Sequence, residues 1–257
     1  MTRGYVYDPG FAEERRRLAA IESLWDPGSQ ALLGEIGVAI GWKCLEVGAG
    51  GGSMVEWMTS RGATVMAIDI DTRFIESLAS DAVEVRRIDV RTDELPRSRF
   101  DLVHARLVLE HLTERGQILS RLVAALRPGG WLVIEDYDWT GFDFDGEDPQ
   151  LERVAGALIT FMQRAGFDPR YGRRLVDDMA AAGLTDVRGE GRARVIDSSS
   201  PGFDFFRLSF ESLRDVAVEA GVLSAEDADA AAARFAEDRR VVTPLMMAAI
   251  GRRPDPR

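Results

Sequence analysis

The sequence predicts an α/β protein with a doubly wound, mostly parallel sheet. In the first half of the chain, short apolar runs alternate with helical segments of about ten residues, which is typical of right-handed βαβ units. A glycine-rich loop follows the first of these runs, at the place where such sheets bind ligands. Two later strand-like segments, 186–196 and 242–250, flank two helical segments and predict a hairpin at the sheet edge with a helical insertion at its turn.

The N-terminal region is expected to be helical. Residues 11–24 place apolar side chains at near-helical spacing among charged ones, which predicts an amphipathic helix. The triplet Asp26-Pro27-Gly28 predicts a break, after which a second helix should continue to Ile36.

The core elements follow in alternation. Each expected strand is a short apolar run, and the expected helices end near glycine, proline or another turn residue. Strands are expected at 42–47, 64–68, 83–88, 100–104 and 131–135, and helices at 53–61, 72–80 and 114–126.

The pattern changes after Tyr137. Residues 138–149 are acidic and aromatic without clear periodicity and predict a loop, and later helices are expected at 151–163, 172–182, 203–220 and 224–238. The length of 257 residues is compatible with one domain. We divide it into N-terminal helices (1–40), a cofactor-binding core (41–138), an insertion with a helix (139–185) and an edge hairpin (186–257) whose helical lid spans about 200–240.

The composition excludes several classes of binding partner and of site. The net charge of −11 argues against nucleic acid or anionic membrane, because both select for basic surfaces. No apolar stretch reaches the roughly 20 residues that span a bilayer, and no leader pattern is visible, so we expect a cytoplasmic protein. We expect it to be a monomer or homodimer. Cys44 is the only cysteine, and the two histidines lack a nearby cysteine, so no metal site is expected.

The glycine-rich loop Leu45–Gly52 carries the first functional signal. Glycines let the backbone turn sharply and approach a ligand, and the helix that follows presents unpaired N–H groups. The dinucleotide fingerprint is G-x-G-x-x-G. Here the glycines stand at 48, 50 and 52, and Ser53 occupies the place of the last glycine, which argues against NAD.

Acidic residues follow the next two strands. Asp69 lies about twenty residues after the loop, where a carboxylate can accept both hydrogen bonds from a ribose diol. Asp71 is better explained as a helix N-cap. At the end of the third strand, the Asp89 carboxylate can take an adenine amino group, and Val90 offers a backbone N–H to the ring.

Together these segments resemble the class I, Rossmann-like family of S-adenosylmethionine-dependent methyltransferases of the small-molecule type. The resemblance covers residues 40–138. The succession of FDLV, LEHL and LRPGG within it is common in these methyltransferases and unusual in dehydrogenases. The blocks are Leu45–Gly52, Ala67–Asp71, Ile88–Val90, FDLV at 100–103, LEHL at 109–112 and LRPGG at 126–130.

The resemblance implies a seven-stranded sheet with one antiparallel edge strand and S-adenosylmethionine as cofactor. Gly48 and Gly50 would lie along its methionine part, and Asp69 would bind its ribose. Asp89 and Val90 would bind adenine. In addition, the carbonyl of Ala105 would accept from the methionine amino group, and Glu46 would orient the glycine loop or contact that amino group through water.

Two residues are candidate catalytic groups. His111 can titrate near neutrality and follows the fourth strand, so it is the candidate base, with a packed or capping histidine as the alternative. Asp136 follows the fifth strand and could act as a base or bind the acceptor, with a solvated acidic loop as the alternative. We expect His104 to be structural. Arg106 could pair with a carboxylate of the substrate or cofactor, or form a surface ion pair.

Aromatic residues in the expected lid favour a small, partly apolar or aromatic methyl acceptor. They are Tyr5, Tyr7, Trp139, Phe142, Phe144, Phe203, Phe205 and Phe206.

The first interpretation is therefore an O- or N-directed methyltransferase of bacterial secondary metabolism. One alternative is a C-methyltransferase, or a protein that uses this fold for a non-methylating rearrangement or cyclisation. Another is a regulatory subunit that binds the cofactor without turnover. An NAD-dependent oxidoreductase fits poorly, because Lys43, the only lysine, precedes the first strand and leaves no tyrosine–lysine pair for hydride transfer.

Overall fold

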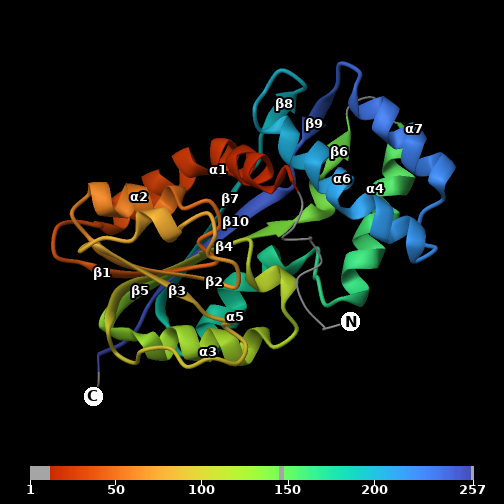
Figure 1. Cartoon of the computed structure of the whole chain (residues 1–257). Helices are drawn as coiled ribbons and strands as arrows, with labels where there is room; N and C mark the ends of the chain where they lie inside the picture. Colours follow the sequence, from red (N-terminus) through yellow and green to blue (C-terminus); the bar gives the residue numbers. More distant parts are fainter. Residues whose placement is uncertain (1–11, 145–147, 256–257) are drawn as a thin grey trace.

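A seven-stranded sheet forms the centre of the structure, a computed structural model that describes residues 12–144 and 148–255. The strand order is β3-β2-β1-β4-β5-β10-β7 (Figure 1). Strands β1 to β5 run parallel, and β10 is antiparallel to both of its neighbours, β5 and β7. This confirms the expected doubly wound, mostly parallel sheet, with its antiparallel strand one position in from the edge strand β7. The strands are β1 (Lys43–Val47), β2 (Thr64–Asp69), β3 (Val83–Arg87), β4 (Phe100–Arg106), β5 (Leu126–Asp138), β7 (Thr185–Arg192) and β10 (Leu245–Arg252).

Helices cover both faces of this sheet. On one face, α1 (Glu14–Ile36) and α2 (Ser53–Ser60) pack through residues such as Leu33 and Val55. On the other face, α3 (Arg115–Ala125) and α5 (Leu175–Ala181) pack through residues such as Leu122 and Met179 (Figure 1). The central strand β4 is buried on both faces, as parallel strands between helical layers must be.

The expected break near Pro27 is wrong, because α1 continues through it as one helix. Proline removes one helical hydrogen bond, but the neighbouring side chains hold this turn in place. Trp25 is buried and donates to the hydroxyl of Tyr137 at 2.6 Å. A Cβ at Gly28 would overlap Nη1 of Arg192, so the glycine makes room for that guanidinium. Tertiary packing therefore keeps α1 continuous through a sequence that predicts a break.

Three other expected elements differ from prediction. The segment expected to be a helix at 72–80 contains only the 3₁₀ turn η1 (Glu76–Leu78). Its residues Ile75 and Leu78 pack against the glycine loop, where a Cβ on Gly52 would lie 2.5 Å from Leu78 Cδ1. The fifth strand begins at Leu126 instead of 131, so the LRPGG block lies inside β5. At 172–182, the 3₁₀ turn η4 (Tyr171–Arg174) precedes the shorter helix α5.

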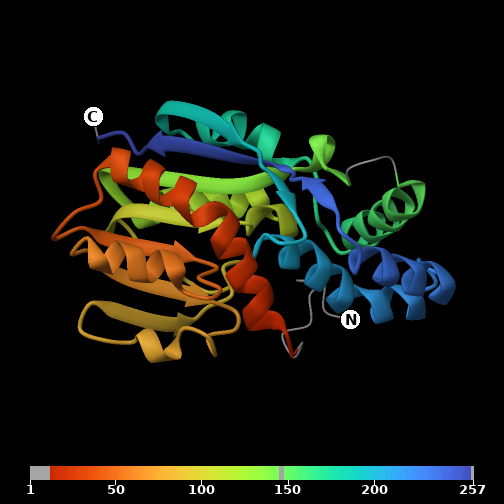
Figure 2. The same ribbon diagram turned by 90° about the horizontal axis from the view of Figure 1, so that it is seen from above.

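Several elements of the second half of the chain build a separate layer, here called the cap. The expected strand at 186–196 divides into β7 and β8 (Val195–Asp197), and that at 242–250 into β9 (Arg240–Val242) and β10. β8 and β9 form a three-stranded sheet with β6 (Asp143–Phe144), which the sequence did not predict. Three helices complete the cap beyond one end of the main sheet (Figure 2). They are α4 (Pro149–Arg164), α6 (Phe203–Glu219) and α7 (Ala225–Phe235), which confirms the expected helices of this region.

Candidate functional site

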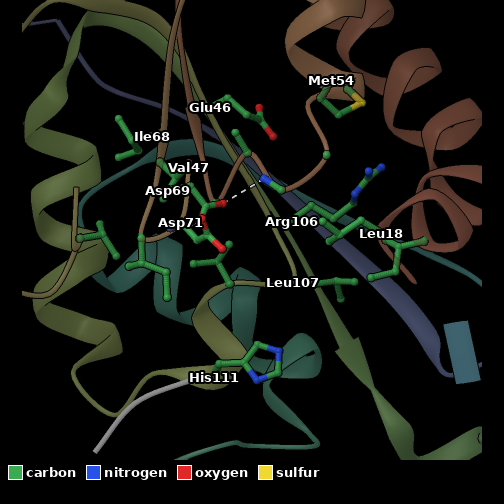
Figure 3. A pocket seen from close by; sticks show the side chains of 18 of the residues that line it. Leu18, Glu46, Val47, Met54, Ile68, Asp69, Asp71, Arg106, Leu107 and His111 are labelled. Atoms are coloured by element: carbon green, nitrogen blue, oxygen red, sulfur yellow. Dashed lines mark hydrogen bonds between the residues drawn. The ribbon is translucent and has the colours of Figure 1, made fainter. Parts of the chain in front are cut away.

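A large pocket opens at the carboxyl ends of β1, β2 and β4, between the sheet, α1 and the cap. Figure 3 shows Asp69 and Asp71 beside the glycine loop, with His111 farther along the same pocket. The predicted residues Glu46, Gly48, Gly50, Asp69, Asp89, Val90 and His111 all line it. Ala105 is fully buried and does not line it, while its neighbours Arg106 and Leu107 do.

The glycine loop has the tight geometry that its sequence predicts. The backbone N–H groups of Gly48 and Ala49 both donate to the carbonyl of Ile68 at the end of β2, at 2.9 and 3.1 Å. Gly48 has a φ of 68°, which L side chains rarely adopt. A Cβ there would also overlap Cγ2 of Val108, so the loop needs glycine at this position.

Asp69 connects the loop to the next strand. Its Oδ2 accepts from the N–H of Gly50 at 2.9 Å, and its Oδ1 accepts from the N–H of Asp71 at 3.0 Å. Burial raises the pKa of this carboxyl, against the lowering effect of these hydrogen bonds. Since each carboxylate oxygen has two lone pairs, Asp69 can still accept from a ligand in the pocket.

Asp89 is held by Arg91. The guanidinium donates to both carboxylate oxygens, with the shortest contact, from Nη2 to Oδ2, at 2.7 Å. Hydrogen bonding from Arg91 lowers the pKa of Asp89, so its carboxyl is ionised at neutral pH. The carbonyl of Val90 accepts from Arg121 at 2.6 Å. The resemblance assigns Asp89 and Val90 to adenine, and both residues line the pocket. The ion pair between Asp89 and Arg91 was not predicted.

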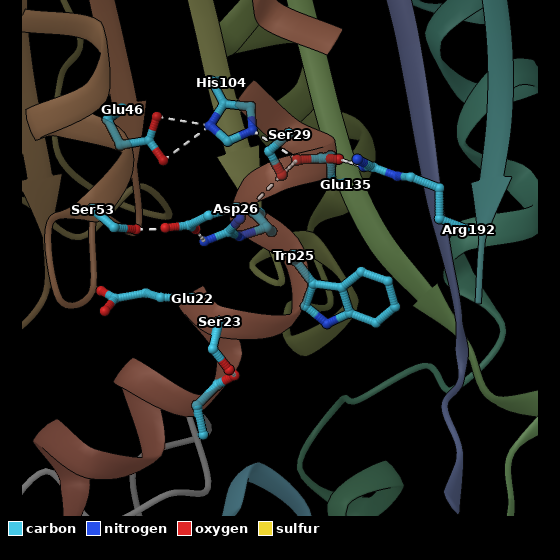
Figure 4. A network of polar contacts seen from close by, with 12 residues as sticks. Glu22, Ser23, Trp25, Asp26, Ser29, Glu46, Ser53, His104, Glu135 and Arg192 are labelled. Carbon is cyan, nitrogen blue, oxygen red and sulfur yellow. Dashed lines mark hydrogen bonds and ion pairs between the residues drawn. The ribbon is translucent and has the colours of Figure 1, made fainter. Parts of the chain in front are cut away.

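Glu46 contacts a histidine. Its carboxylate lies 2.7 Å from Nδ1 of His104, whose Nε2 lies 3.1 Å from Glu135 (Figure 4). All three side chains are buried. This agrees with a structural role for His104, and it shows that Glu46 is oriented from β4 and β5.

This polar network continues to α1 and β7. Glu135 also accepts from Ser29 at 2.5 Å and from Arg192 (Figure 4). Arg106 donates to Ser29 and, at 2.8 Å, to Asp26, so it forms a largely buried ion pair within the protein. Neither Asp26 nor Ser29 was predicted to take part, although both flank the Pro27-Gly28 pair.

His111 closes the far end of the pocket. It lies in the turn η2 (Leu109–His111), and its ring stacks on Phe167 with 5.1 Å between centroids. Burial, with the nearby cations Arg17 and Arg115, lowers its pKa to about 3. The imidazole is therefore neutral at pH 7.

Asp136 lies behind the pocket. It is therefore neither part of a solvated acidic loop nor in a position to contact an acceptor, so both predictions for it are wrong. It is fully buried, does not line the pocket, and accepts from the N–H of Val108 at 3.0 Å. Burial raises its pKa to about 8. The neighbouring carboxyl of Glu110 also has a raised pKa, first through burial and then through the charge of Asp136. Both carboxyls hold the segment 108–111 against β5, because Glu110 accepts from the N–H of Tyr137 at 2.8 Å.

The aromatic residues divide between two places. Trp139 and Phe205 line the main pocket, while Phe142, Phe144 and Phe206 line a second cavity in the cap. Phe203 is packed in the cap core, and Tyr5 and Tyr7 fall outside the described residues. The sequence did not single out Phe167, which joins His111 to this aromatic group.

Comparison with known proteins identifies the core. Residues 45–134 match the family model of the methyltransferase domain, and this range holds the glycine loop, Asp69, Asp89 and His111. These residues form a methyltransferase domain. The chain is 36% identical to methyltransferase str2 of Strobilurus tenacellus over 142 residues, which are 52% of this chain and 50% of that protein. It is 35% identical to a ubiquinone biosynthesis O-methyltransferase of Bradyrhizobium sp. (strain ORS 278), over 40% of this chain and 43% of that protein.

The fold extends beyond the methyltransferase domain. A phosphoethanolamine N-methyltransferase 2 of Haemonchus contortus superposes with a TM-score of 0.58 at 17% identity, covering 93% of this chain and 57% of that one. The chain spans about half the length of the curated relatives it matches. Neither a helix long and apolar enough for a membrane span nor a group of three or more metal-ligating side chains is found within residues 12–144 and 148–255.

Proposed function

We propose that the protein transfers a methyl group from S-adenosylmethionine to a small acceptor. One observation carries this proposal. The glycine loop and Asp69 are joined by a direct hydrogen bond at one end of a pocket, and His111 with its aromatic neighbours forms the other end of the same pocket. In this proposal a donor site and an acceptor site share one cavity, whose donor end and His111 lie within the methyltransferase domain.

The residues at the donor end fit S-adenosylmethionine. The close approach of backbone at Gly48 and Gly50 suits its methionine part, and the Asp69 carboxylate suits its ribose hydroxyls. Ile70 lines the pocket and is 38% exposed, so it offers an apolar surface to a flat base next to Asp89. In this assignment Glu46 faces the amino group. The carbonyl of Ala105, which the resemblance implied as a further acceptor, is buried outside the pocket and has no place in the assignment.

The chain itself has little covalent chemistry to perform. When bound, S-adenosylmethionine supplies a methyl group on a positively charged sulfur, and the protein must align the acceptor and exclude water. Trp139 and Phe205 form an apolar wall at the acceptor end. Neutral His111 can accept a hydrogen bond from an acceptor O–H or N–H and orient its lone pair toward the methyl group.

The acceptor is proposed to be small, partly apolar or aromatic, and methylated on oxygen or nitrogen. The aromatic wall supports the apolar part, and the net charge of −11 argues against nucleic acid. The relative in ubiquinone biosynthesis is named as an O-methyltransferase, which supports oxygen. We retain bacterial secondary metabolism as a proposal.

The test is transfer of labelled methyl from S-adenosylmethionine to a panel of phenols, catechols and aryl amines. We expect label in at least one acceptor O- or N-methyl product, together with stoichiometric S-adenosylhomocysteine. Label on carbon would favour the C-methyltransferase alternative. Conversion of an acceptor without label would favour a rearrangement or cyclisation, and binding of the donor without any product would favour a regulatory subunit.

A further inference from the structure

A second cavity lies in the cap between α4, α6 and α7. Its wall consists of apolar and aromatic side chains apart from Ser209. None of the ion pairs in the described ranges involves a residue of this wall. The cavity therefore has the chemistry of an apolar ligand site rather than of a site for a charged group.

This cap cavity adjoins the main pocket. Trp139, just after β5, and Phe205, in the first turn of α6, line both. Aromatic contacts run without interruption from the acceptor end of the main pocket into the cap. Successive ring centroids are separated by 5.1 Å for His111–Phe167, 6.4 Å for Phe167–Trp139, 5.0 Å for Trp139–Phe142 and 5.4 Å for Phe142–Phe206.

The wall of the cap cavity also holds two buried polar atoms. Nε1 of Trp139 and Oγ of Ser209 have no hydrogen-bond partner among the residues that the structure describes. A buried donor without a partner is unfavourable by about 1–3 kcal/mol. Because both residues line the cap cavity, a ligand that carries one polar group along an otherwise apolar body can pair with one of these atoms once its side chain turns toward the cavity.

We propose that the cap cavity binds an apolar arm of the methyl acceptor, while the reactive head of the same molecule lies beside His111. This inference rests on the proposed function. The shared Trp139 and Phe205 select this occupant, since an arm that leaves the acceptor end of the main pocket meets them first. The substrate class is then a phenol, catechol or aryl amine that carries an alkyl or similar apolar chain.

The experiment measures equilibrium binding, so it does not depend on turnover. The full chain is titrated by calorimetry with 4-ethylphenol, 4-hexylphenol and 1-hexanol. Burial of each methylene should strengthen binding about fourfold, so 4-hexylphenol should bind roughly a hundredfold or more tightly than 4-ethylphenol. It should also bind more tightly than 1-hexanol, which has the chain but no aromatic head.

Two variants fill the cavity from different helices. Ala155→Leu on α4 and Ser209→Leu on α6 should each remove most of the difference between the two phenols. The control Ala233→Leu adds the same side chain at an exposed position of α7 and should leave the difference intact. Thermal melting of each variant identifies any that does not fold, and the other filling variant then provides the test.

Three results would overturn the inference. The phenols could bind equally or not at all up to their solubility, the difference could persist in folded filling variants, or 1-hexanol could bind as tightly as 4-hexylphenol. The proposed function fails separately, through absence of labelled methyl transfer. If no labelled methyl is transferred but binding still depends on the chain length of the phenol, the proposed enzymatic function is wrong and the proposed ligand site in the cap stands.

Discussion

The N–H of Gly50 donates a 2.9 Å hydrogen bond to the carboxylate of Asp69 (Figure 3). These residues are nineteen positions apart and belong to the two motifs that predicted the donor site. The contact means that the strand-end acid has two roles. It fixes the loop, and it presents its remaining lone pairs to the pocket.

Asp69→Ala should weaken binding of S-adenosylhomocysteine about tenfold or more, because a charge-assisted hydrogen bond contributes about 1.5–3 kcal/mol. Calorimetry gives the dissociation constant, and melting temperatures separate weaker binding from unfolding. The exposed acid Asp81 supplies the control, and Asp81→Ala should bind like the unaltered protein. Equal affinity in Asp69→Ala would remove this residue from the donor site.

Gly48→Ala should reduce both stability and donor binding. A non-glycine residue at this left-handed φ costs about 1–2 kcal/mol, and its Cβ would press on Val108. Gly37→Ala is a matched control, since Gly37 has a φ of 99° and a Cβ there would meet no atom within 4 Å. Both variants should unfold at lower urea concentration, but only Gly48→Ala should lose affinity for S-adenosylhomocysteine. Comparable affinity in the two would mean that the loop does not approach the ligand.

Asp136→Asn should change how stability depends on pH. The folded pKa of Asp136 is about 8, above its unfolded value of about 3.9, so the protonated carboxyl favours the folded state. This contribution to the free energy of unfolding is complete below about pH 4 and is lost between about pH 4 and pH 8. The free energy of unfolding falls by at most about 1.4 kcal/mol per pH unit over this range. Asparagine cannot titrate, and it also removes the charge that raises the pKa of Glu110. Urea unfolding at pH 5 and 8 should show a smaller fall in stability for the variant, and an unchanged fall would place the titrating group elsewhere.

Glu135→Ala should destabilise the fold by about 3–5 kcal/mol, because it leaves the buried His104 and the partly buried Arg192 without their shared carboxylate. Glu190→Ala removes only an exposed carboxylate 3.7 Å from the same arginine and should change stability by less than about 1 kcal/mol. Urea denaturation of both variants provides the comparison. A small effect of Glu135→Ala would show that the network adds little to stability.

The sequence predicted the main sheet well because its signals are local. Each parallel strand is an apolar run bounded by turn residues, and the glycine loop needs its residues for backbone geometry alone. The ends of adjacent parallel strands meet at one edge of the sheet, so the positions of Asp69 and Asp89 followed from their order in the chain. Both line the pocket as predicted.

The errors arose where distant contacts decide the structure. Pro27 and Gly28 predicted a break, but burial of Trp25 and the guanidinium of Arg192 keep α1 continuous. Asp136 resembled part of an open acidic loop, yet β5 continues to Asp138 and the segment 108–111 covers the Asp136 carboxyl. The small sheet of the cap pairs strands separated by about a hundred residues, and no short-range pattern reports such pairing.

The most direct test of the central claim is calorimetry of the unaltered protein with S-adenosylhomocysteine and, separately, with NAD⁺. We predict saturable binding of one S-adenosylhomocysteine per chain and no binding of NAD⁺. Binding of NAD⁺ without binding of S-adenosylhomocysteine would contradict the claim.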